Sequence, residues 1–414
     1  MSEPLARTGQ TREVGHLPLA GIKVIEICNT IAGPACARLL ADFGADVIKI
    51  EPPQGDPVRQ IGGCVGGISL YATSILRNKR SIVIDLKSED GRELALALIE
   101  KADVVLENNR PGVLERLGLG YEQVSEKKPA IIYVRISGYG QDGPYAERPG
   151  YGVICEAVAG VRHMTGDPDR PPARVALATT DYLTSVYAAF GTLAALRSRD
   201  QTGRGQVVDV ALYETAFTQL EPLVPAYQKL NKVPMRQGPN LPSLAPNSLY
   251  PTRDNGYLLI AANNDAIFQR LLNAMQQPEL AKDPRFCSIR VRAEKPNMKA
   301  LDAIISEWTS QYEAVELEKI IRAAEVPVSR VYTIADIFDD PHYRARNMLP
   351  VVPHPSLGEV AQVGVVPRLS ATPGSIRHTG PELGADTISV LRDELRIDQQ
   401  RLDAMLREGV VRDR

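Results

Sequence analysis

One carboxylate in the sequence has surroundings that can make it chemically reactive. Residues 175–196 form a stretch of 22 residues in which Asp181 is the one charged residue. The Thr, Ser and Tyr residues of this stretch predict a buried helix rather than a membrane span. Asp181 then has two interpretations. It is either a helix-start carboxylate stabilised by free backbone N–H groups, or a nucleophile that is activated because water solvates it poorly.

Two basic segments are candidates for phosphate binding. Residues 76–80 read LRNKR, and residues 107–118 read ENNRPGVLERLG. Each is by itself typical of a solvated loop or, with Pro111 at the first helical position, of a helix start. We expect both at the ligand-binding edge of a parallel sheet, where cations and a helix N-terminus hold phosphate groups. Together they favour a phosphorylated cofactor.

The histidines and cysteines form no recognisable catalytic or metal-binding pattern. The five cysteines are scattered without a C-x-x-C pair, and none of the five histidines accompanies a G-x-S-x-G elbow. We therefore expect no disulfide framework, no metal site and no Ser or Cys hydrolase. His163, near a Gly-rich turn, is interpreted as a hydrogen-bonded structural residue.

The glycines argue against a nicotinamide-dependent enzyme. A dinucleotide site needs three glycines in the first turn from strand to helix, whereas residues 29–34 (NTIAGP) contain Gly33 alone. A second glycine cluster, residues 62–67 (GGCVGG), lacks a following helix at the required spacing. It is interpreted as a mobile loop.

The elements that must position these residues alternate between strands and helices. Apolar strands are predicted at residues 21–28, 45–51, 81–86, 103–108 and 130–137, with helices at 34–43, at 88–102 and after Pro111. This alternation predicts an α/β fold with a parallel sheet covered by helices. Around residues 201–205 we expect a turn between two helical stretches.

Length and composition indicate further units. A chain of 414 residues favours two or three domains. Beyond Leu223 the sequence becomes rich in Pro and Asn, and a smaller α+β unit follows, with a strand at 257–263 and helices at 265–274 and 299–312. The unit closes near Val331, and the tail adds extended segments and two amphipathic helices.

The net charge is −2, from 48 Lys and Arg against 50 Asp and Glu. This balance provides no bulk electrostatic field for nucleic acid or an anionic membrane. Residues 1–16 carry both charge signs and no apolar run, so we expect no secretory signal and a cytoplasmic protein.

A set of longer motifs resembles one known family. The motifs lie at residues 18–59, 78–92, 107–122, 171–181, 202–212 and 282–286, and include PLAGIKVIEIC, NKRSIVIDL, ENNRPGVLERLG and PPARVALATTD. In this order they resemble the family III CoA-transferases of the CaiB/BaiF type, which include formyl-CoA transferase. The resemblance extends from about Pro18 to the final helix.

The resemblance implies a homodimer of two interlocked ring-like chains. Residues 18–222 and 332–414 form a Rossmann-like large domain, and residues 223–331 form a linker and an inserted small domain. CoA lies on the large domain, near the small domain of the partner subunit. No cofactor is permanently bound and no metal is required, because acyl-CoA thioesters and free carboxylic acids are the substrates.

The resemblance also assigns Asp181 as the catalytic residue. Its carboxylate attacks the donor thioester and gives a mixed anhydride and CoA thiolate, which re-attacks to form an aspartyl-CoA thioester. The acceptor acid repeats these steps in reverse. Since one thioester replaces another, the enzyme mainly has to orient its substrates, exclude water and stabilise oxyanions.

Six further positions match the family's CoA-binding residues. They are Ile84 and Lys87 near the adenine, Asn108 and Asn109 beside the pantetheine, and Val113 and Arg116 on the helix that runs along CoA.

Four positions match the family's substrate pocket. Tyr151 corresponds to a tyrosine close to the thioester, and Gly238 stands where a polyglycine loop shields intermediates in the formyl-CoA enzyme. Ile31 replaces a glutamine and Gly152 an acidic residue, so the pocket is larger or less polar. Arg174 is expected to pair with the distal carboxylate of a longer diacid. We therefore expect succinyl-CoA as donor and a C4–C6 dicarboxylate as acceptor.

Two other functions remain as alternatives. An α-methylacyl-CoA racemase shares the implied fold but places a histidine base where this chain has Tyr151, so proton abstraction lacks its base. A non-catalytic acyl-CoA-binding protein is the second alternative, because a fold by itself does not establish chemistry. The presence of Asp181 argues against it.

Overall fold

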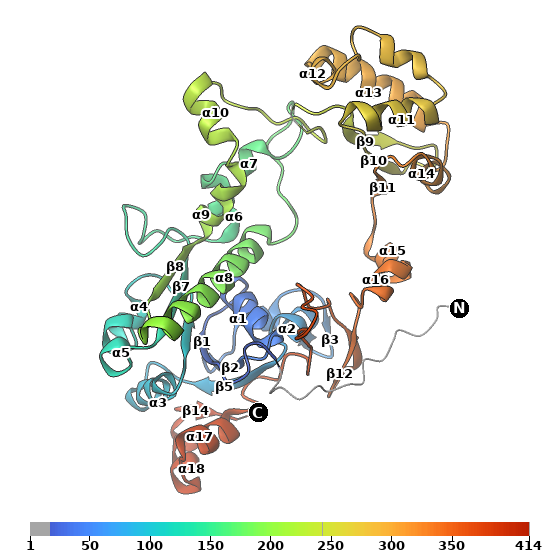
Figure 1. The fold of residues 1–414 in the computed structure, drawn as a ribbon. Helices are drawn as coiled ribbons and strands as arrows, with labels where there is room; N and C mark the ends of the chain where they lie inside the picture. The colour runs from blue at the N-terminus through green and yellow to red at the C-terminus, as the bar shows by residue number, and fades with distance from the viewer. Residues whose placement is uncertain (1–16, 242, 414) are drawn as a thin grey trace. The chain divides into compact units, whose positions relative to one another are not determined.

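A mainly parallel sheet forms the centre of the protein's first unit (Figure 1). The computed structural model describes residues 17–241 and 243–413, and within them seven strands pair in the order β14-β5-β2-β1-β6-β7-β8. All neighbours are parallel except β14, which runs antiparallel to β5. The strands are β1 (Lys23–Ile27), β2 (Asp46–Glu51), β5 (Lys79–Ile84), β6 (Val104–Glu107), β7 (Ile132–Ser137), β8 (Val207–Ala211) and β14 (Val411–Arg412). The predicted α/β fold with a largely parallel sheet is confirmed.

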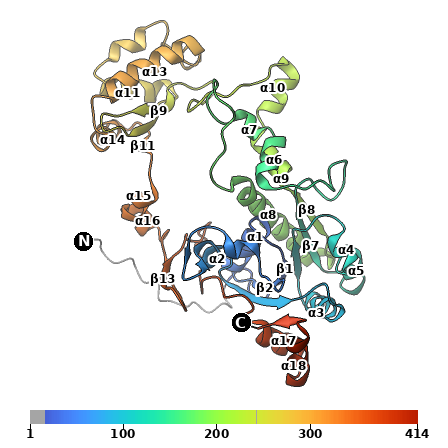
Figure 2. The same ribbon diagram turned by 180° about the vertical axis from the view of Figure 1, so that it is seen from behind.

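Helices cover both faces of this sheet (Figure 2). One face packs against α3 (Glu89–Glu100), α5 (Tyr121–Lys127), α17 (Thr387–Leu395) and α18 (Gln399–Glu408). The other packs against α1 (Ala32–Asp42), α6 (Gly152–Val158), α8 (Thr179–Thr202) and α9 (Leu212–Phe217). Buried on both sides, the strands contain continuous apolar runs, as parallel strands do.

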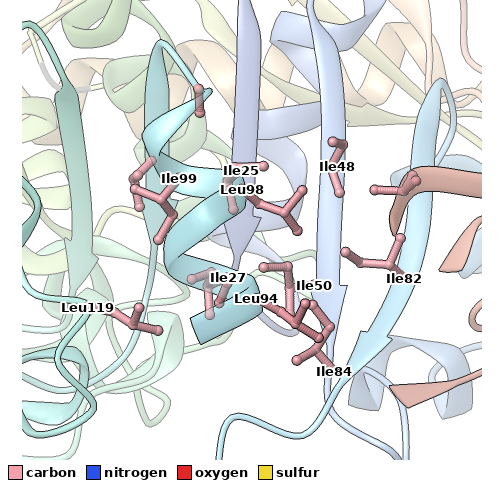
Figure 3. Close-up of a cluster of buried hydrophobic side chains, with 14 of the residues drawn as sticks. Ile25, Ile27, Ile48, Ile50, Ile82, Ile84, Leu94, Leu98, Ile99 and Leu119 are labelled. Carbon is pink, nitrogen blue, oxygen red and sulfur yellow. The ribbon is translucent and has the colours of Figure 1, made fainter. Parts of the chain in front are cut away.

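Side chains alternate between the two faces along each strand. Ile25 and Ile27 of β1 point toward α3, where they join Leu94 and Leu98 (Figure 3), whereas Val24 belongs to the opposite cluster. This alternation divides the apolar core of the first unit into two layers.

Shorter elements complete the first unit. They are the 3-10 helix η2 (Pro57–Gln60), the hairpin β3 (Cys64–Val65) and β4 (Ile68–Ser69), α2 (Leu70–Ile75), α4 (Val113–Arg116), the 3-10 helix η3 (Thr218–Leu220), α10 (Leu223–Leu230), α16 (Pro341–Ala345), β12 (Val351–His354) and β13 (Gly358–Ala361). The helix α7 (Val161–Met164) begins at the last residue before the second unit.

The second unit has its own sheet and core. Residues Arg162–Arg174 and Leu230–Asp340 form it, with the antiparallel order β11-β10-β9. Its elements are β9 (Asn247–Pro251), β10 (Tyr257–Ala261), α11 (Asp265–Ala274), η4 (Pro278–Lys282), α12 (Ile289–Arg292), α13 (Lys295–Thr309), α14 (Ala314–Ala323), β11 (Val328–Arg330) and α15 (Ile334–Asp339). Leu271, Ile305 and Leu317 from three of its helices are fully buried against β10.

The boundaries of the two units differ from the predicted domain limits of 222/223 and 331/332. Residues 162–174, expected in the large domain, belong to the second unit. The guanidinium of Arg236 donates hydrogen bonds to the carbonyl oxygens of His163, Asp167 and Arg170, and these bonds tie the segment to the second unit. Such backbone contacts have no signal in the residue pattern.

Two local predictions were wrong. Residues 201–205 do not separate two helices, because the following residues Val207–Ala211 form β8 at the edge of the sheet. The glycine cluster at residues 62–67 is not a simple loop but part of the hairpin β3–β4, in which Gly66 and Gly67 both have positive φ angles. Glycine accepts these angles at little cost, so the pair forms the hairpin turn.

Within the described residues, none of the helices combines the length and the apolarity that crossing a membrane requires. The same part of the chain holds no group of three or more His, Cys, Asp or Glu side chains arranged for a metal ion. The expectation about a secretory signal concerns residues 1–16, which lie outside the described residues.

A cluster of buried charges connects three neighbouring strands of the sheet, β1, β2 and β5. Glu26 of β1 accepts hydrogen bonds from Lys49 of β2 (2.9 Å) and from Lys79 of β5 (2.7 Å), and Lys49 also pairs with Asp56 (2.8 Å). All four side chains are almost completely buried. Burial opposes the charged form of Lys49, but the carboxylates of Glu26 and Asp56 raise its pKa above the usual range. The cluster is stable because each charge has a partner.

We expect Glu26→Gln to lower the free energy of unfolding by about 3–5 kcal/mol, because two buried lysines then lose their shared carboxylate. Glu313→Gln is the matched control: its ion pair with Arg253 is exposed (61% and 57%), and its loss should change stability by at most about 1 kcal/mol. Urea unfolding followed by circular dichroism measures both. Equal losses of unfolding free energy in the two variants would contradict the role of Glu26 as the shared partner of the two buried lysines.

Candidate active site

A cavity of about 520 Å³ opens at the carboxyl ends of β1, β6 and β7. Its walls come from the segments that follow these strands, together with α4 and the first turns of α1 and α8. Ligands of open α/β sheets bind at this edge. The cavity brings together seven residues that the sequence singled out: Ile31, Asn108, Asn109, Val113, Arg116, Tyr151 and Asp181.

Asp181 lies in the first turn of α8, with its side chain half-buried. Burial raises the pKa of its carboxyl to about 6, and a backbone hydrogen bond only partly offsets this effect. Within the described residues no Lys or Arg side chain contributes to its pKa or pairs with it. Asp181 is therefore both a helix-start carboxylate and a poorly solvated one, as the two interpretations of the sequence suggested. The loss of solvating water has the larger effect on its pKa.

The carboxylate of Asp181 occupies the space beside Gly152, the first residue of α6. A Cβ atom added at Gly152 would lie 2.2 Å from Oδ2 of Asp181. The missing side chain therefore provides room for the carboxylate rather than for a larger substrate. The neighbouring Tyr151 is 70% exposed, and it lines the same cavity.

The loop between β1 and α1 forms a second wall, and the buried charges hold it in place. Lys49 donates a hydrogen bond to the carbonyl oxygen of Cys28 (2.6 Å), and Asp56 accepts one from the backbone N–H of Thr30 (2.9 Å). Thr30 has a φ angle of 69°, which is costly for a β-branched residue. The hydrogen bond that Thr30 donates to Asp56 offsets that cost and fixes the loop next to Ile31.

Both asparagines of the predicted CoA-binding set fasten strand ends to each other. The side chain of Asn108 accepts a hydrogen bond from the N–H of Asn29 (2.9 Å) and donates one to its carbonyl oxygen (2.8 Å). The side chain of Asn109 donates to the carbonyl oxygen of Ile27 (3.3 Å). These amides shape the wall of the cavity, and their predicted contact with pantetheine stays a prediction.

Arginines stand around the cavity. Arg110, Arg116 and Arg148 line it and are exposed to solvent. The guanidinium of Arg148 lies over the ring of Tyr145, 3.6 Å from its centroid. The segment ENNRPGVLERLG thus brings cations to the carboxyl edge of the sheet, where they can meet phosphate groups.

The other basic segment, LRNKR, does not reach this edge. It precedes its strand, and in a parallel sheet it therefore lies at the amino edge. Arg77 is buried and pairs with Asp42 through two hydrogen bonds, while Arg80 pairs with Asp46 and Glu394. The expectation that this segment helps to hold phosphates was wrong, because carboxylates already occupy its cations.

Four predicted site residues lie outside the cavity. Ile84 is a fully buried core residue at the end of β5, and Lys87 is exposed in the turn that follows. Arg174 and Gly238 belong to the second unit, where Arg174 is exposed and Gly238, with a φ angle of 63°, donates a hydrogen bond to Gly166. His163 contacts the carbonyl oxygen of Pro234 (3.0 Å), so its predicted structural hydrogen bond is confirmed.

Sequence reasoning missed the residues that support the loop. Glu26 and Lys49 each interrupt an apolar strand one or two residues before its end. A charge in such a position needs a buried partner, and two opposite charges on neighbouring strands can supply it. That signal was present in VIEIC and VIKIE.

Comparisons with known proteins agree on one family. Residues 19–387 match the family model described as CoA-transferase family III. A succinyl-CoA–D-citramalate CoA-transferase of Chloroflexus aurantiacus is 44% identical over 396 residues, covering 95% of this chain and 98% of its own. The beta subunit of a succinyl-CoA–L-malate CoA-transferase from the same organism is 40% identical over 400 residues, covering 95% and 98%.

A solved structure shares the fold as well. The crystal structure of a CaiB/BaiF family protein from Brucella suis superposes with a TM-score of 0.82 at 35% sequence identity. The match covers 92% of this chain and 100% of that one.

The carboxyl group of Asp181 is expected to titrate near pH 6. Burial opposes its charged form, so the group is protonated below this pH and ionised above it, whereas an ordinary aspartate titrates near about 4. Carbon NMR of protein with labelled aspartate side chains measures the midpoint, and Asp181→Asn identifies the signal. A midpoint at or below the ordinary value would show that the carboxylate is well solvated.

Proposed function

Because this chain belongs to CoA-transferase family III, we propose that it moves CoA from succinyl-CoA to a free dicarboxylic acid, with Asp181 as the residue that carries the acyl group. The observation that carries the proposal is the half-buried Asp181 carboxylate, which lines the cavity without a counter-ion among the described residues. The names of two relatives, which act with succinyl-CoA on citramalate and malate, support the choice of substrates.

CoA is proposed to lie along the edge of the sheet with its thioester in the cavity. Arg110 and Arg116 provide exposed cations for its phosphates, and Val113 provides an apolar contact for the pantetheine. Ile84 and Lys87, outside the cavity, are proposed to lie near the adenine. The acyl group then reaches Asp181 from the side of Tyr151.

The proposed reaction begins with attack of an Asp181 carboxylate oxygen on the carbonyl carbon of succinyl-CoA. The carbon–sulfur bond breaks, and CoA leaves as a thiolate while a mixed anhydride remains on the enzyme. The thiolate then attacks the Asp181 carbonyl carbon, releases succinate and forms an aspartyl-CoA thioester. No proton is transferred in these steps, and they require no metal or redox cofactor.

The second half of the reaction reverses the first. A carboxylate oxygen of the acceptor attacks the aspartyl-CoA thioester, the thiolate leaves, and a new mixed anhydride forms. The thiolate then attacks the acceptor's carbonyl carbon, which forms the new acyl-CoA and returns the Asp181 carboxylate. Each half of the reaction forms one carbon–oxygen and one carbon–sulfur bond and breaks one bond of each kind. The equilibrium therefore depends on the two acids and their thioesters.

Partial burial of Asp181 suits this chemistry. With a pKa of about 6, most of the carboxylate is ionised at pH 7, while its thin hydration leaves the oxygen more reactive. Water hydrolyses both the anhydride and the thioester. The cavity walls formed by residues 28–32 and by α6 limit the access of water to these intermediates.

The racemase alternative gains no support from the cavity. That reaction needs a base beside the α-carbon, and the described lining of the cavity contains no histidine. Tyr151 occupies the position of the racemase base.

We also propose the homodimer of interlocked chains that the resemblance implies. Val186, Phe190 and Leu193 follow one another on a single face of α8 and are 45–69% exposed. An apolar groove of about 340 Å³ runs beside them, lined also by Leu39 and Phe43 of the adjacent chain segment. Such a contiguous apolar surface is typical of an interface, and a second copy of the chain would cover it.

Mixing the protein with succinyl-CoA and hydroxylamine is expected to convert Asp181 into a hydroxamate, because the amine intercepts the acylated carboxyl group. Peptide mass spectrometry locates the adduct. Asp181→Asn should lose at least about a thousandfold in kcat, since the nucleophile is gone. Asp200→Asn, an exposed position at the other end of α8, is the control and should keep full activity. Turnover without any adduct at Asp181 would overturn the proposed mechanism.

Gly152→Ala is expected to lower kcat by about a hundredfold or more, because the new Cβ displaces the carboxylate by more than the reaction tolerates. Binding of CoA should change little, since the substitution does not reach α4. Gly63→Ala is the matched control, because its Cβ meets its nearest neighbour at 3.9 Å. Steady-state kinetics and calorimetric titration with CoA separate the two effects, and an unchanged kcat in Gly152→Ala would contradict this role.

A further inference from the structure

Three helices bring polar side chains together directly beside Asp181. Tyr182 follows the nucleophile in α8, and its hydroxyl lies 2.9 Å from the hydroxyl of Tyr71 in α2. The α8 helix is fastened to α1 by the hydroxyl of Ser185, which donates to the carbonyl oxygen of Ala32 (2.7 Å). The tyrosine pair therefore has a fixed position next to the reacting carboxylate.

Arg38 of α1 completes this group. Ala35 and Arg38 are spaced so that they share one face of the helix, and Ala35 belongs to a small apolar cluster against which Ile31 and Tyr71 also pack. The guanidinium of Arg38 interacts electrostatically with Arg77 and Asp42, and more weakly with the hydroxyls of Tyr182 and Tyr71. We call Arg38, Tyr71 and Tyr182 the Arg–Tyr cluster.

Arg38 forms no ion pair in the part of the chain that the structure describes, although the carboxylate of Asp42 acts on it from a greater distance. Its Nε atom is buried and forms no hydrogen bond, and no carboxylate lies within ion-pair distance. The nearest candidate, Asp42, is already bound by the guanidinium of Arg77 and by the side chain of Asn78. Arg38 is partly buried, and a buried Nε without an acceptor is costly, so the position is explained if an anion arrives with a substrate.

The tyrosines match this requirement. Burial and the hydrogen bond to Tyr182 raise the pKa of Tyr71 above its usual range, so its hydroxyl stays protonated and can donate. One of the two tyrosine protons is used in the Tyr71–Tyr182 hydrogen bond, so the guanidinium fork and the one remaining hydroxyl donor form a recognition set for a carboxylate. No carboxylate of the described residues occupies it.

We propose that the Arg–Tyr cluster binds the distal carboxylate of the dicarboxylic substrate while the other end of the molecule reacts at Asp181. This inference rests on the proposed function. Succinate leaves before the acceptor enters, so the cluster holds the distal carboxylate of the succinyl group first and that of the acceptor afterwards. The sequence suggested Arg174, a residue of the second unit, for this task, and that assignment stays a separate prediction.

The test compares two donors that differ only at their distal end, succinyl-CoA and butyryl-CoA, in the wild-type protein and in Arg38→Met. We expect kcat/KM for succinyl-CoA to fall by about 10- to 100-fold in Arg38→Met, while the value for butyryl-CoA stays within about twofold. Arg38→Lys should recover part of the loss, since it keeps the charge but not the fork. Tyr182→Phe should reduce the preference for succinyl-CoA by a smaller factor.

Arg401→Met, an exposed arginine of α18, is the matched control and should leave both donors unaffected. Melting temperature and size-exclusion chromatography verify that the variants keep their fold and assembly. If Arg38→Met lowers the values for both donors equally, or for neither, the inference is wrong while the proposed function stands. If the wild-type protein transfers CoA from no donor, the proposed function fails first, and with it the inference.

Discussion

The ligand edge of this protein depends on one buried carboxylate, that of Glu26. It is shared by Lys49 and Lys79, and these lysines hold the carbonyl oxygens of Cys28 and Pro34 with their remaining N–H groups. A lysine in such a dry place would lose its proton or unfold the strand if its partner were absent. The charges therefore determine where β1 ends and α1 begins, and with this the path of the loop that lines the cavity.

Two kinds of charge can be distinguished in the first unit. Those that build the fold are paired: Arg77 holds Asp42 with two hydrogen bonds in the interior. Those that we assign to the reaction form no ion pair among the described residues: Asp181 has no counter-ion, and the buried Nε of Arg38 has no hydrogen-bond partner. An unpaired, partly buried charge destabilises the protein when no ligand is bound. A ligand of opposite charge, or a covalent bond formed with the substrate, compensates for this cost. Structural and reactive charges cannot be distinguished by location alone, since Arg38 and Arg77 both lie near Asp42.

The periodic pattern of the sequence predicted the secondary structure, but it could not predict contacts between residues that are distant in the chain. Alternating apolar runs gave the order of strands and helices, and an isolated acid in residues 175–196 led to Asp181. The two basic segments looked equivalent in sequence, yet one follows its strand and the other precedes it, so they lie at opposite edges of the sheet. The role of Gly152 was misjudged for a similar reason, because the carboxylate that fills its space is 29 positions further along the chain. Arg38 gave no signal at all, since an arginine in an amphipathic helix is ordinary until its partners are known.

An enzyme that exchanges CoA between two acids must bind both acids in the same active site. In the proposed mechanism, donor and acceptor acids each form an anhydride with Asp181, so one pocket must accept both and can select only for features that they share. Malate and citramalate, the acids named for two relatives, differ from succinate in a hydroxyl group and in a hydroxyl plus a methyl group, respectively, but both keep a second carboxylate. A rigid recognition of that carboxylate by α1, α2 and α8 fixes one end of every substrate. The variable groups then face the cavity on the side of Tyr151, whose side chain is 70% exposed and therefore loosely packed. Selection among dicarboxylates is therefore expected to depend on that wall, and selection against monocarboxylates on the cluster behind Asp181.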